Sequence, residues 1–181
     1  MKIFISKLDA AKRQLETSLK IFFYDGDPVS VHTLMHTSYE ILTQLCANQG
    51  VESIINEGLK KFIREDKQKE IKIKLNEAKN FFKHSGYDSN KNIEFNPEIN
   101  PILLWDSCRL YKILTTEYTP IMSIFHMWFV LKNKEIISDE KLKETLNTFN
   151  YTNYLDIGNK KHFLETMLPI AEKTIPIETI R

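Results

Sequence analysis

The residues with the greatest chemical potential lie together in the segment KNFFKH at positions 79–84. If one helix continues through this segment, Asn80 and His84 lie on the same face about one turn apart, and Lys79 can swing its ammonium towards that face. Near neutral pH an imidazole serves as a general base or acid, and a neighbouring cation can hold a phosphate. Lys79, Asn80 and His84 are therefore candidate catalytic residues for phosphodiester cleavage without a metal. The structural alternative is a helix end, where a histidine and the following Gly86 are both favoured.

A second candidate site is a pair of histidines, His32 and His36, spaced four residues apart. Two histidines one helical turn apart can share a metal ion. Thr33 occupies the position at which a zinc-protease helix carries its glutamate, so the sequence lacks the His-Glu-x-x-His motif. Glu40 is the one nearby candidate for a third metal ligand. The alternative is a polar helix face or a second packing surface. In the helix predicted at 28–47 the helical period clusters seven residues on one face: Val31, Leu34, Met35, Ser38, Ile41, Leu42 and Leu45. The histidine face lies opposite Leu34, Ile41 and Leu45 of this stripe.

A third feature is the concentration of positive charge between residues 60 and 84. This stretch has nine Lys or Arg and four Asp or Glu, whereas the whole chain has 25 basic and 24 acidic residues. A solvated helix face is one explanation, and an electrostatic footprint for RNA or DNA is the other. The overall charge of +1 provides no general attraction to nucleic acid or to acidic lipid.

The composition limits the class of protein. The chain has 181 residues, 42% of them hydrophobic and 27% charged, which is typical of one globular domain. Two cysteines, Cys46 and Cys108, cannot form a disulfide framework or a cysteine zinc site, and free thiols indicate a reducing compartment. The longest apolar run, residues 124–131, is too short to cross a bilayer. We expect a cytoplasmic protein with no membrane span and no cofactor.

Five glycines and six prolines are sparse breakers between long segments of helical period, which predicts an all-α protein. Asp27 and Pro28 are typical of a helix start, and Pro169 is expected near a helix end. Residues 85–97 form the one long polar loop. Helices are predicted at about 6–24, 28–47, 51–84 (interrupted near Gly58 or near 65–66), 101–115, 120–131, 138–149 and 159–171. The predicted fold is a single-domain antiparallel bundle of about six to seven helices.

The apolar stripes of these helices predict the core. The helix at 120–131 is apolar on nearly every side and is expected at the centre of the bundle or at an oligomer contact. The core residues expected from the other stripes are Leu15, Leu19, Leu34, Ile41, Leu45, Leu75, Phe82 and Leu104.

Residues 10–42 comprise a helix, a short acidic turn and a second helix, and they resemble the opening of HEPN domains, which are small all-α bundles of toxin and defence proteins. In that family a later helix carries Arg, then a polar residue, often Asn, and then His. Lys79, Asn80 and His84 match these positions with four residues between the first and the last, except that lysine replaces arginine. The resemblance covers residues 6–84 and extends at most to 131. The chain also resembles bacterial proteins that share the segment NFFKH, which implies no function.

The HEPN resemblance implies a homodimer whose paired motifs face each other, and metal-independent cleavage of RNA. In that interpretation His84 is the general base or acid, Lys79 the phosphate-facing cation and Asn80 the orienting amide. Lysine keeps the positive charge but loses the planar bidentate fork of arginine. Two other interpretations stay open: a non-catalytic helical module that dimerises or binds a protein partner, and a metal-binding bundle that uses His32 and His36.

Overall fold

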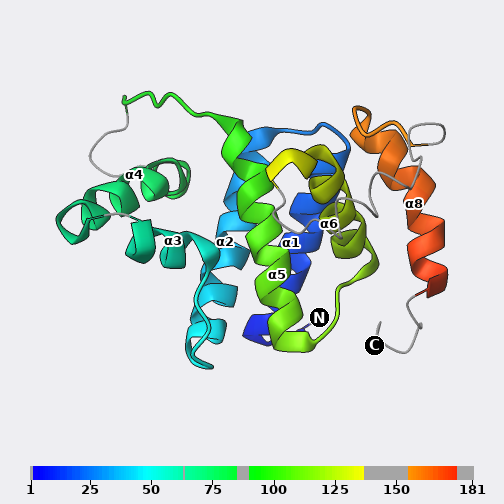
Figure 1. The fold of residues 1–181 in the computed structure, drawn as a ribbon, viewed down its shortest axis with the longest axis horizontal. Coiled ribbons are helices and arrows are strands. Elements are labelled where there is room, and N and C mark those ends of the chain that lie inside the picture. Colours follow the sequence, from blue (N-terminus) through cyan, green and yellow to red (C-terminus); the bar gives the residue numbers. More distant parts are fainter. Residues whose placement is uncertain (1, 63, 85–89, 137–154, 175–181) are drawn as a thin grey trace.

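The computed structural model of the chain describes residues 2–62, 64–84, 90–136 and 155–174 (Figure 1). These ranges contain seven α-helices, two short 3-10 helices and no β-strand, so the all-α prediction is confirmed. The α-helices are α1 (Lys7–Phe23), α2 (Pro28–Ala47), α3 (Ile54–Phe62), α4 (Glu65–Lys83), α5 (Asn100–Thr115), α6 (Pro120–Lys132) and α8 (Lys160–Thr174). The 3-10 helices are η1 (Pro97–Ile99) and η2 (Lys134–Ile136). The predicted helix at 138–149 lies outside the described residues.

Four helices, α1, α2, α5 and α6, form the central bundle (Figure 1). The turn after α1 reverses the chain, so that α1 and α2 pack side by side in opposite directions. Gly26 is required in this turn, because an added Cβ would come within 2.7 Å of the Ile21 Cγ2 atom. On one side of the bundle α8 packs against α6, and on the other side α3 and α4 lie beside α2.

Local capping chemistry sets the starts of the first two helices. The hydroxyl of Ser6 accepts a hydrogen bond from the Asp9 N–H at 3.0 Å, and the Asp9 carboxylate accepts one from the Ser6 N–H, which completes a capping box. The carboxylate of Asp27 accepts the Ser30 N–H at 2.7 Å, with Pro28 in the first turn. The predicted start of α2 is confirmed.

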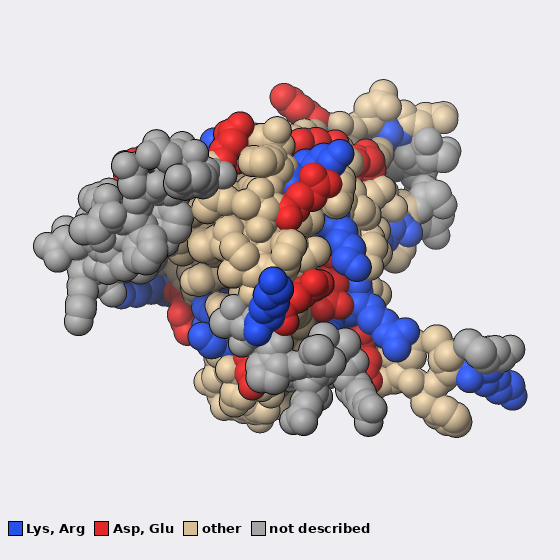
Figure 2. All heavy atoms as spheres, turned by 90° about the vertical axis from the view of Figure 1, so that its right-hand side faces the viewer, with Lys and Arg blue, Asp and Glu red and all other residues tan. Residues whose placement is uncertain are grey.

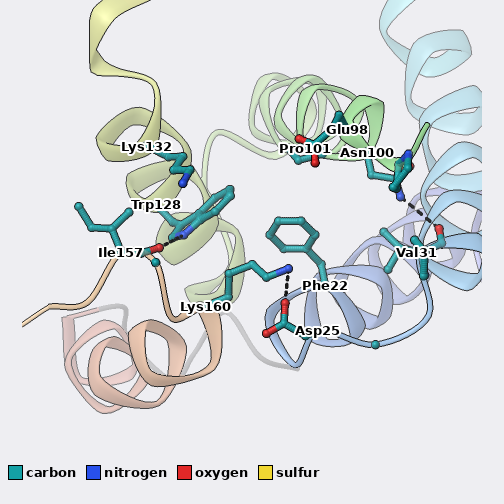
Figure 3. A pocket seen from close by; sticks show the side chains of 14 residues that line it. Phe22, Asp25, Val31, Glu98, Asn100, Pro101, Trp128, Lys132, Ile157 and Lys160 are labelled. Carbon is teal, nitrogen blue, oxygen red and sulfur yellow. Dashed lines mark hydrogen bonds and ion pairs between the residues drawn. The ribbon is translucent and has the colours of Figure 1, made fainter.

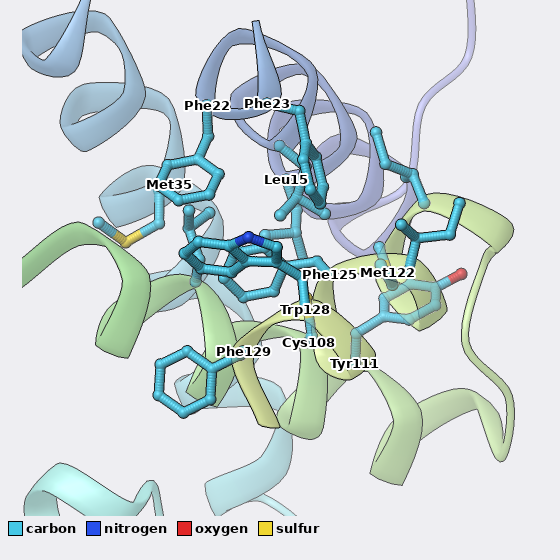
Figure 4. Close-up of a cluster of buried hydrophobic side chains, with 14 of the residues drawn as sticks. Leu15, Phe22, Phe23, Met35, Cys108, Tyr111, Met122, Phe125, Trp128 and Phe129 are labelled. Carbon is cyan, nitrogen blue, oxygen red and sulfur yellow. The ribbon is translucent and has the colours of Figure 1, made fainter. Parts of the chain in front are cut away.

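Aromatic side chains of α1 and α6 fill the centre of the core (Figure 4). The ring of Phe22 meets that of Trp128 edge to face, with 5.2 Å between centroids, and Phe23 meets Phe125 in the same way at 6.0 Å. Each such buried side chain stabilises the fold by roughly 1.5–3 kcal/mol. The apolar α6 therefore lies inside the bundle, as its composition predicts. Three predicted core residues are fully buried: Leu15, Leu19 and Leu104.

The core prediction for α2 is confirmed in part. Four residues of the predicted stripe are buried: Val31, Met35, Ser38 and Leu42. The buried surface of α2 also includes His32, His36 and Cys46, because this helix contacts α1, α5 and α4 on different sides. The predicted core residues that are only half-buried are Leu34, Ile41, Leu45, Leu75 and Phe82.

Two further predictions concern helix ends. The interruption within 51–84 falls between α3 and α4, next to the predicted position at 65–66, and Gly58 lies inside α3. The expected end at Pro169 is wrong, because α8 continues to Thr174. Because proline has no N–H, Pro169 leaves the carbonyl of Glu165 without its helical donor. Pro169 is exposed, so water can hydrogen-bond this carbonyl, and the usual destabilisation by an interior proline is reduced.

None of the helices in the described ranges combines the length and the hydropathy needed to cross a membrane.

Candidate functional site

The predicted catalytic residues lie at the C-terminal end of α4. The helix ends at Lys83, and His84 is its C-cap with an extended backbone (φ −131°, ψ 125°). The His84 N–H donates to the Asn80 carbonyl at 3.0 Å, and both residues are exposed. The last helical hydrogen bond thus reaches His84, and the chain leaves the helical path there.

Lys79 points towards α2 and is bound there. Its Nζ lies 2.5 Å from Glu40 Oε1, and the Nζ of Lys83 lies 3.3 Å from Glu40 Oε2. Only 13% of the Lys79 side chain is exposed. Partial burial by itself would raise the pKa of Glu40, but the hydrogen bond from Lys79 and the charge of Lys83 outweigh it, and the pKa is lowered. The ionised carboxylate of Glu40 therefore ties α4 to α2.

A shallow groove of about 590 Å³ along α4 brings two of the three predicted residues together. Lys79 and Asn80 line it, with Lys72 two turns and Lys69 about three turns before Lys79, whereas His84 is not among its lining residues. The structure thus associates the cation and the amide in one groove, and His84 lies outside the lining of that groove.

Much of the positive charge at residues 60–84 is compensated locally. Six of its nine basic residues form ion pairs with Glu40, Glu52, Asp66 or Glu70. Lys69 and Lys72 form no ion pair with another described residue. On the opposite side of the molecule, basic and acidic side chains also lie interspersed (Figure 2). The free charge of this region is therefore smaller than its sequence implies.

His32 and His36 lie inside the protein, so of the two predicted alternatives to a metal site the structure agrees with the second packing surface and not with a polar face. They are 1% and 4% exposed, and their ring centroids are 4.6 Å apart. His32 Nδ1 lies 2.8 Å from the Asn100 Oδ1 atom, and the Asn100 amide donates to the carbonyl of Pro28 at 3.1 Å. Since this Asn100 oxygen accepts, His32 carries its hydrogen on Nδ1. The ring of Phe82 from α4 closes over His32 with 5.7 Å between centroids.

Burial keeps both histidines uncharged near neutral pH. Desolvation lowers the pKa of His32, and it lowers that of His36 to about 3, with help from the neighbouring His32 and lysine charges. The Nε2 atom of His32 and both ring nitrogens of His36 are buried and have no hydrogen-bond partner among the described residues. The same part of the chain contains no group of three His, Cys, Asp or Glu side chains that could hold a metal ion.

A buried charge network on α5 was not anticipated from the sequence. Asp106 is 1% exposed, and its carboxylate accepts hydrogen bonds from Arg109 Nε at 2.9 Å, from the Tyr39 hydroxyl at 3.1 Å and from the Ile54 N–H at 3.1 Å. Arg109 also donates to the carbonyl of Glu52 at 2.9 Å. The spacing of Asp106 and Arg109 by three residues within an apolar helix was the available signal. The network fixes the start of α3 against α2 and α5.

This network positions a cleft of about 410 Å³ between α2, α3, α4 and α5. His36 and Thr43 of α2 line it, facing apolar side chains that include Leu59 of α3, Leu75 of α4 and Leu103 of α5. Thr43 Oγ1 is buried and, like the ring nitrogens of His36, has no hydrogen-bond partner among the described residues.

Another pocket, of about 430 Å³, lies where α8 begins, beside the α1–α2 turn (Figure 3). Two of its charged groups pair with each other: Lys160 Nζ lies 2.6 Å from Asp25 Oδ1, and it also lies 4.2 Å from the centre of the Phe22 ring. The indole of Trp128 donates to the carbonyl of Ile157 at 3.1 Å. These contacts join α8 to the bundle, so we interpret this pocket as a structural joint.

No family model matches the chain, and neither a curated protein nor a solved structure is found to match it. The functional argument therefore depends on the chemistry of the described residues.

Proposed function

We propose that this chain is a non-catalytic helical module that associates with a second copy of itself through its N-terminal arm. The observation that supports this is the exposure of Ile3, Phe4 and Ile5, which precede α1 in an irregular segment, with Phe4 fully exposed. The capping box at Ser6 fixes the point at which the arm leaves the bundle. Three consecutive exposed apolar side chains are typical of a contact surface.

The positions of the motif residues favour a non-catalytic role. A phosphate that approached Lys79 would have to displace the carboxylate of Glu40 from it. His84 stands outside the groove that Lys79 and Asn80 share. General acid–base catalysis needs the reacting groups within hydrogen-bond reach of one substrate position, and this arrangement does not assemble them within one chain.

The surface proposed to receive the arm is an apolar groove of about 480 Å³ formed by α1, α8 and the connection between α5 and α6. Tyr24 and Leu168 are two of its accessible apolar residues. Its rim carries Glu16, Glu117 and Glu172 together with two lysines, and none of these glutamates forms an ion pair with another described residue. The arm contributes Lys2 beside its apolar residues, which is complementary to an acidic rim.

The size of the arm predicts a reversible complex. A reciprocal exchange between two copies buries six apolar side chains, each worth roughly 1.5–3 kcal/mol. Association costs about 4–15 kcal/mol in lost freedom. The middle of these two ranges leaves about 4 kcal/mol, which corresponds to a weak complex with a dissociation constant of about 1 mM.

The test is light scattering over a range of protein concentrations. We expect the mass to rise from monomer to dimer in the wild type, and this rise to be lost in Phe4→Ser and in Tyr24→Ser. Ile73→Ser is the matched control, because it removes an apolar side chain of intermediate exposure (62%, between Tyr24 at 52% and the fully exposed Phe4) from α4, away from both arm and groove. A monomer at every concentration contradicts the proposal, and so does a dimer that both arm and groove variants leave intact.

The second candidate function is metal-independent RNA cleavage by Lys79, Asn80 and His84. It is favoured by the unpaired Lys69 and Lys72, which extend the α4 groove with positive charge. The test is cleavage of mixed RNA in the presence of EDTA. Under this hypothesis His84→Ala lowers the rate by about 10²–10⁴, and Lys79→Arg preserves or raises it. Equal activity in the wild type and His84→Ala would exclude this motif as the catalyst.

A further inference from the structure

The cleft between α2 and the α3–α4 pair contains polar atoms that the rest of the described chain leaves without partners. His36 is only 4% exposed and lines the cleft. Neither of its ring nitrogens has a hydrogen-bond partner among the described residues. Thr43 lies two turns further along α2 and adds an unpartnered hydroxyl. Buried polar groups are nearly always hydrogen bonded, and an unsatisfied one is costly, so these atoms indicate a position that a ligand completes.

The lining defines what such a ligand must look like. A neutral imidazole offers one donor and one acceptor, and a hydroxyl offers both. The facing walls are apolar, with Leu59, Leu75 and Leu103 among them. A molecule that fits therefore has an apolar or aromatic body and an edge that both donates and accepts.

The charges around the cleft favour an uncharged ligand. The one carboxylate in the lining, that of Glu40, is already held by Lys79 and Lys83. The pKa of His36 is lowered, so its ring supplies no positive charge near neutral pH. A cation inside the cleft would lose its hydration without gaining an unengaged carboxylate there. An anion could gain a counter-charge from Lys72, which forms no ion pair with another described residue, but Lys72 is exposed and hydrated at the outer side of the cleft.

We propose that this cleft is a binding site for a small uncharged aromatic amide, or an equivalent heterocycle, whose donor–acceptor edge pairs with His36 and Thr43. The ring of the ligand packs against the leucines of α3, α4 and α5. The volume of about 410 Å³ lies within the usual range for small-molecule sites.

Occupation of the site would affect the packing of α4. No side chain of α4 is fully buried, and the helix is attached to α2 chiefly by Glu40 and by half-buried residues such as Leu75 and Phe82. A ligand that contacts both α2 and α4 adds apolar contact between them. We therefore expect ligand binding to slow amide hydrogen exchange in α4.

The experiment uses the full chain and three probes of similar size: benzamide, toluene and benzoate. Binding is followed by two-dimensional amide NMR during titration. We expect saturable shifts of residues lining the cleft with benzamide, and binding at least about 10-fold weaker with toluene and with benzoate. This order separates a polar uncharged site from an apolar cavity and from an anion site.

Two variants assign the hydrogen bonds. His36→Phe removes both ring nitrogens while keeping an aromatic ring, and we expect it to weaken benzamide binding about 10-fold or more. Thr43→Val removes only the hydroxyl, with an expected loss of about 3- to 10-fold. The matched control is Thr37→Val, because the Thr37 hydroxyl donates to the Thr33 carbonyl at 3.0 Å on the same helix and does not line the cleft.

Stability in the absence of ligand provides an independent readout. Because His36 has no partner to lose, His36→Phe should melt at the same temperature as the wild type or higher. A large fall in melting temperature would show that its nitrogens are hydrogen bonded in the free protein, by ordered water for example, and would overturn the proposal. Three other results would also overturn the proposal. They are benzamide shifts that do not saturate, binding of toluene or benzoate as tight as that of benzamide, and a benzamide affinity that is unchanged in both cleft variants.

Discussion

Replacement of Asp106 by alanine is the sharpest test of how α3 and its cleft are held. The carboxylate is 1% exposed and accepts three hydrogen bonds, from Arg109, Tyr39 and the Ile54 N–H. Its removal leaves a buried hydroxyl, a backbone N–H and a largely buried guanidinium without their acceptor. Asp106→Ala therefore acts on the junction of α2, α3 and α5 together.

The magnitude follows from the burial of the two partners. Removing one member of a buried ion pair typically costs about 3–5 kcal/mol. The Arg109 side chain keeps 25% of its surface exposed, so water can recover part of its hydration, and we expect a loss near the lower limit, about 3 kcal/mol. For a protein of this size that loss lowers the melting temperature by about 6–12 °C. Asp106→Asn keeps an acceptor oxygen and should lose less.

Urea unfolding followed by far-UV circular dichroism measures the effect. The matched control is Asp66→Ala, because Asp66 forms the same kind of pair with Arg64, in which 56% and 82% of the two side chains are exposed. Exposed pairs contribute little, so this control should unfold like the wild type. If Asp106→Ala loses no more stability than Asp66→Ala, the reasoning from burial and hydrogen bonding is refuted.

Three further predictions concern other contacts. Glu40→Gln should speed amide hydrogen exchange in α4, because it removes the carboxylate that binds Lys79, and exchange equal to that of the wild type would contradict this role. The pKa of Glu40 is lowered in the folded state, so this ion pair should stabilise α4 above the ordinary carboxyl pKa of 4.5 and be lost as the pH falls through the lowered pKa. Ser6→Ala should lower the free energy of unfolding by about 0.5–2 kcal/mol in the same urea assay, and no change would mean that the capping box does not stabilise α1. Burial raises the pKa of the Cys46 and Cys108 thiols, so a thiol reagent should label them only after denaturation, and rapid labelling of native protein would be inconsistent with their burial.

The helices were predictable because their signals are local. Asp27 and Pro28 mark the start of α2 through chemistry that needs only neighbouring residues. The apolar composition of α6 was enough to place it in the core. Pro169 misled the prediction of a helix end, because a helix on the surface can keep a proline where water replaces the lost donor.

The candidate sites were less predictable, because they depend on pairs of residues far apart in the sequence. The segment at 79–84 was recognised, but the bond between Lys79 and Glu40 joins residues 39 positions apart. His36 was noticed for its spacing from His32, yet its burial depends on α3, α4 and α5. The sequence of α2 contains no pattern that predicts which helices pack around His36.

By itself, the sequence determined that this protein is a helical bundle, where its first helices begin, and which helix is central. These properties follow from composition, capping and a period of 3.6 residues, all of which operate within one segment. Only the tertiary structure decided that α2 also buries its histidine face, that Glu40 binds Lys79, and that His36 lines a cleft with no hydrogen-bond partner among the described residues. A helix enclosed on several sides has more than one face to bury, and the helices that dock against it determine which of its polar groups meet a partner.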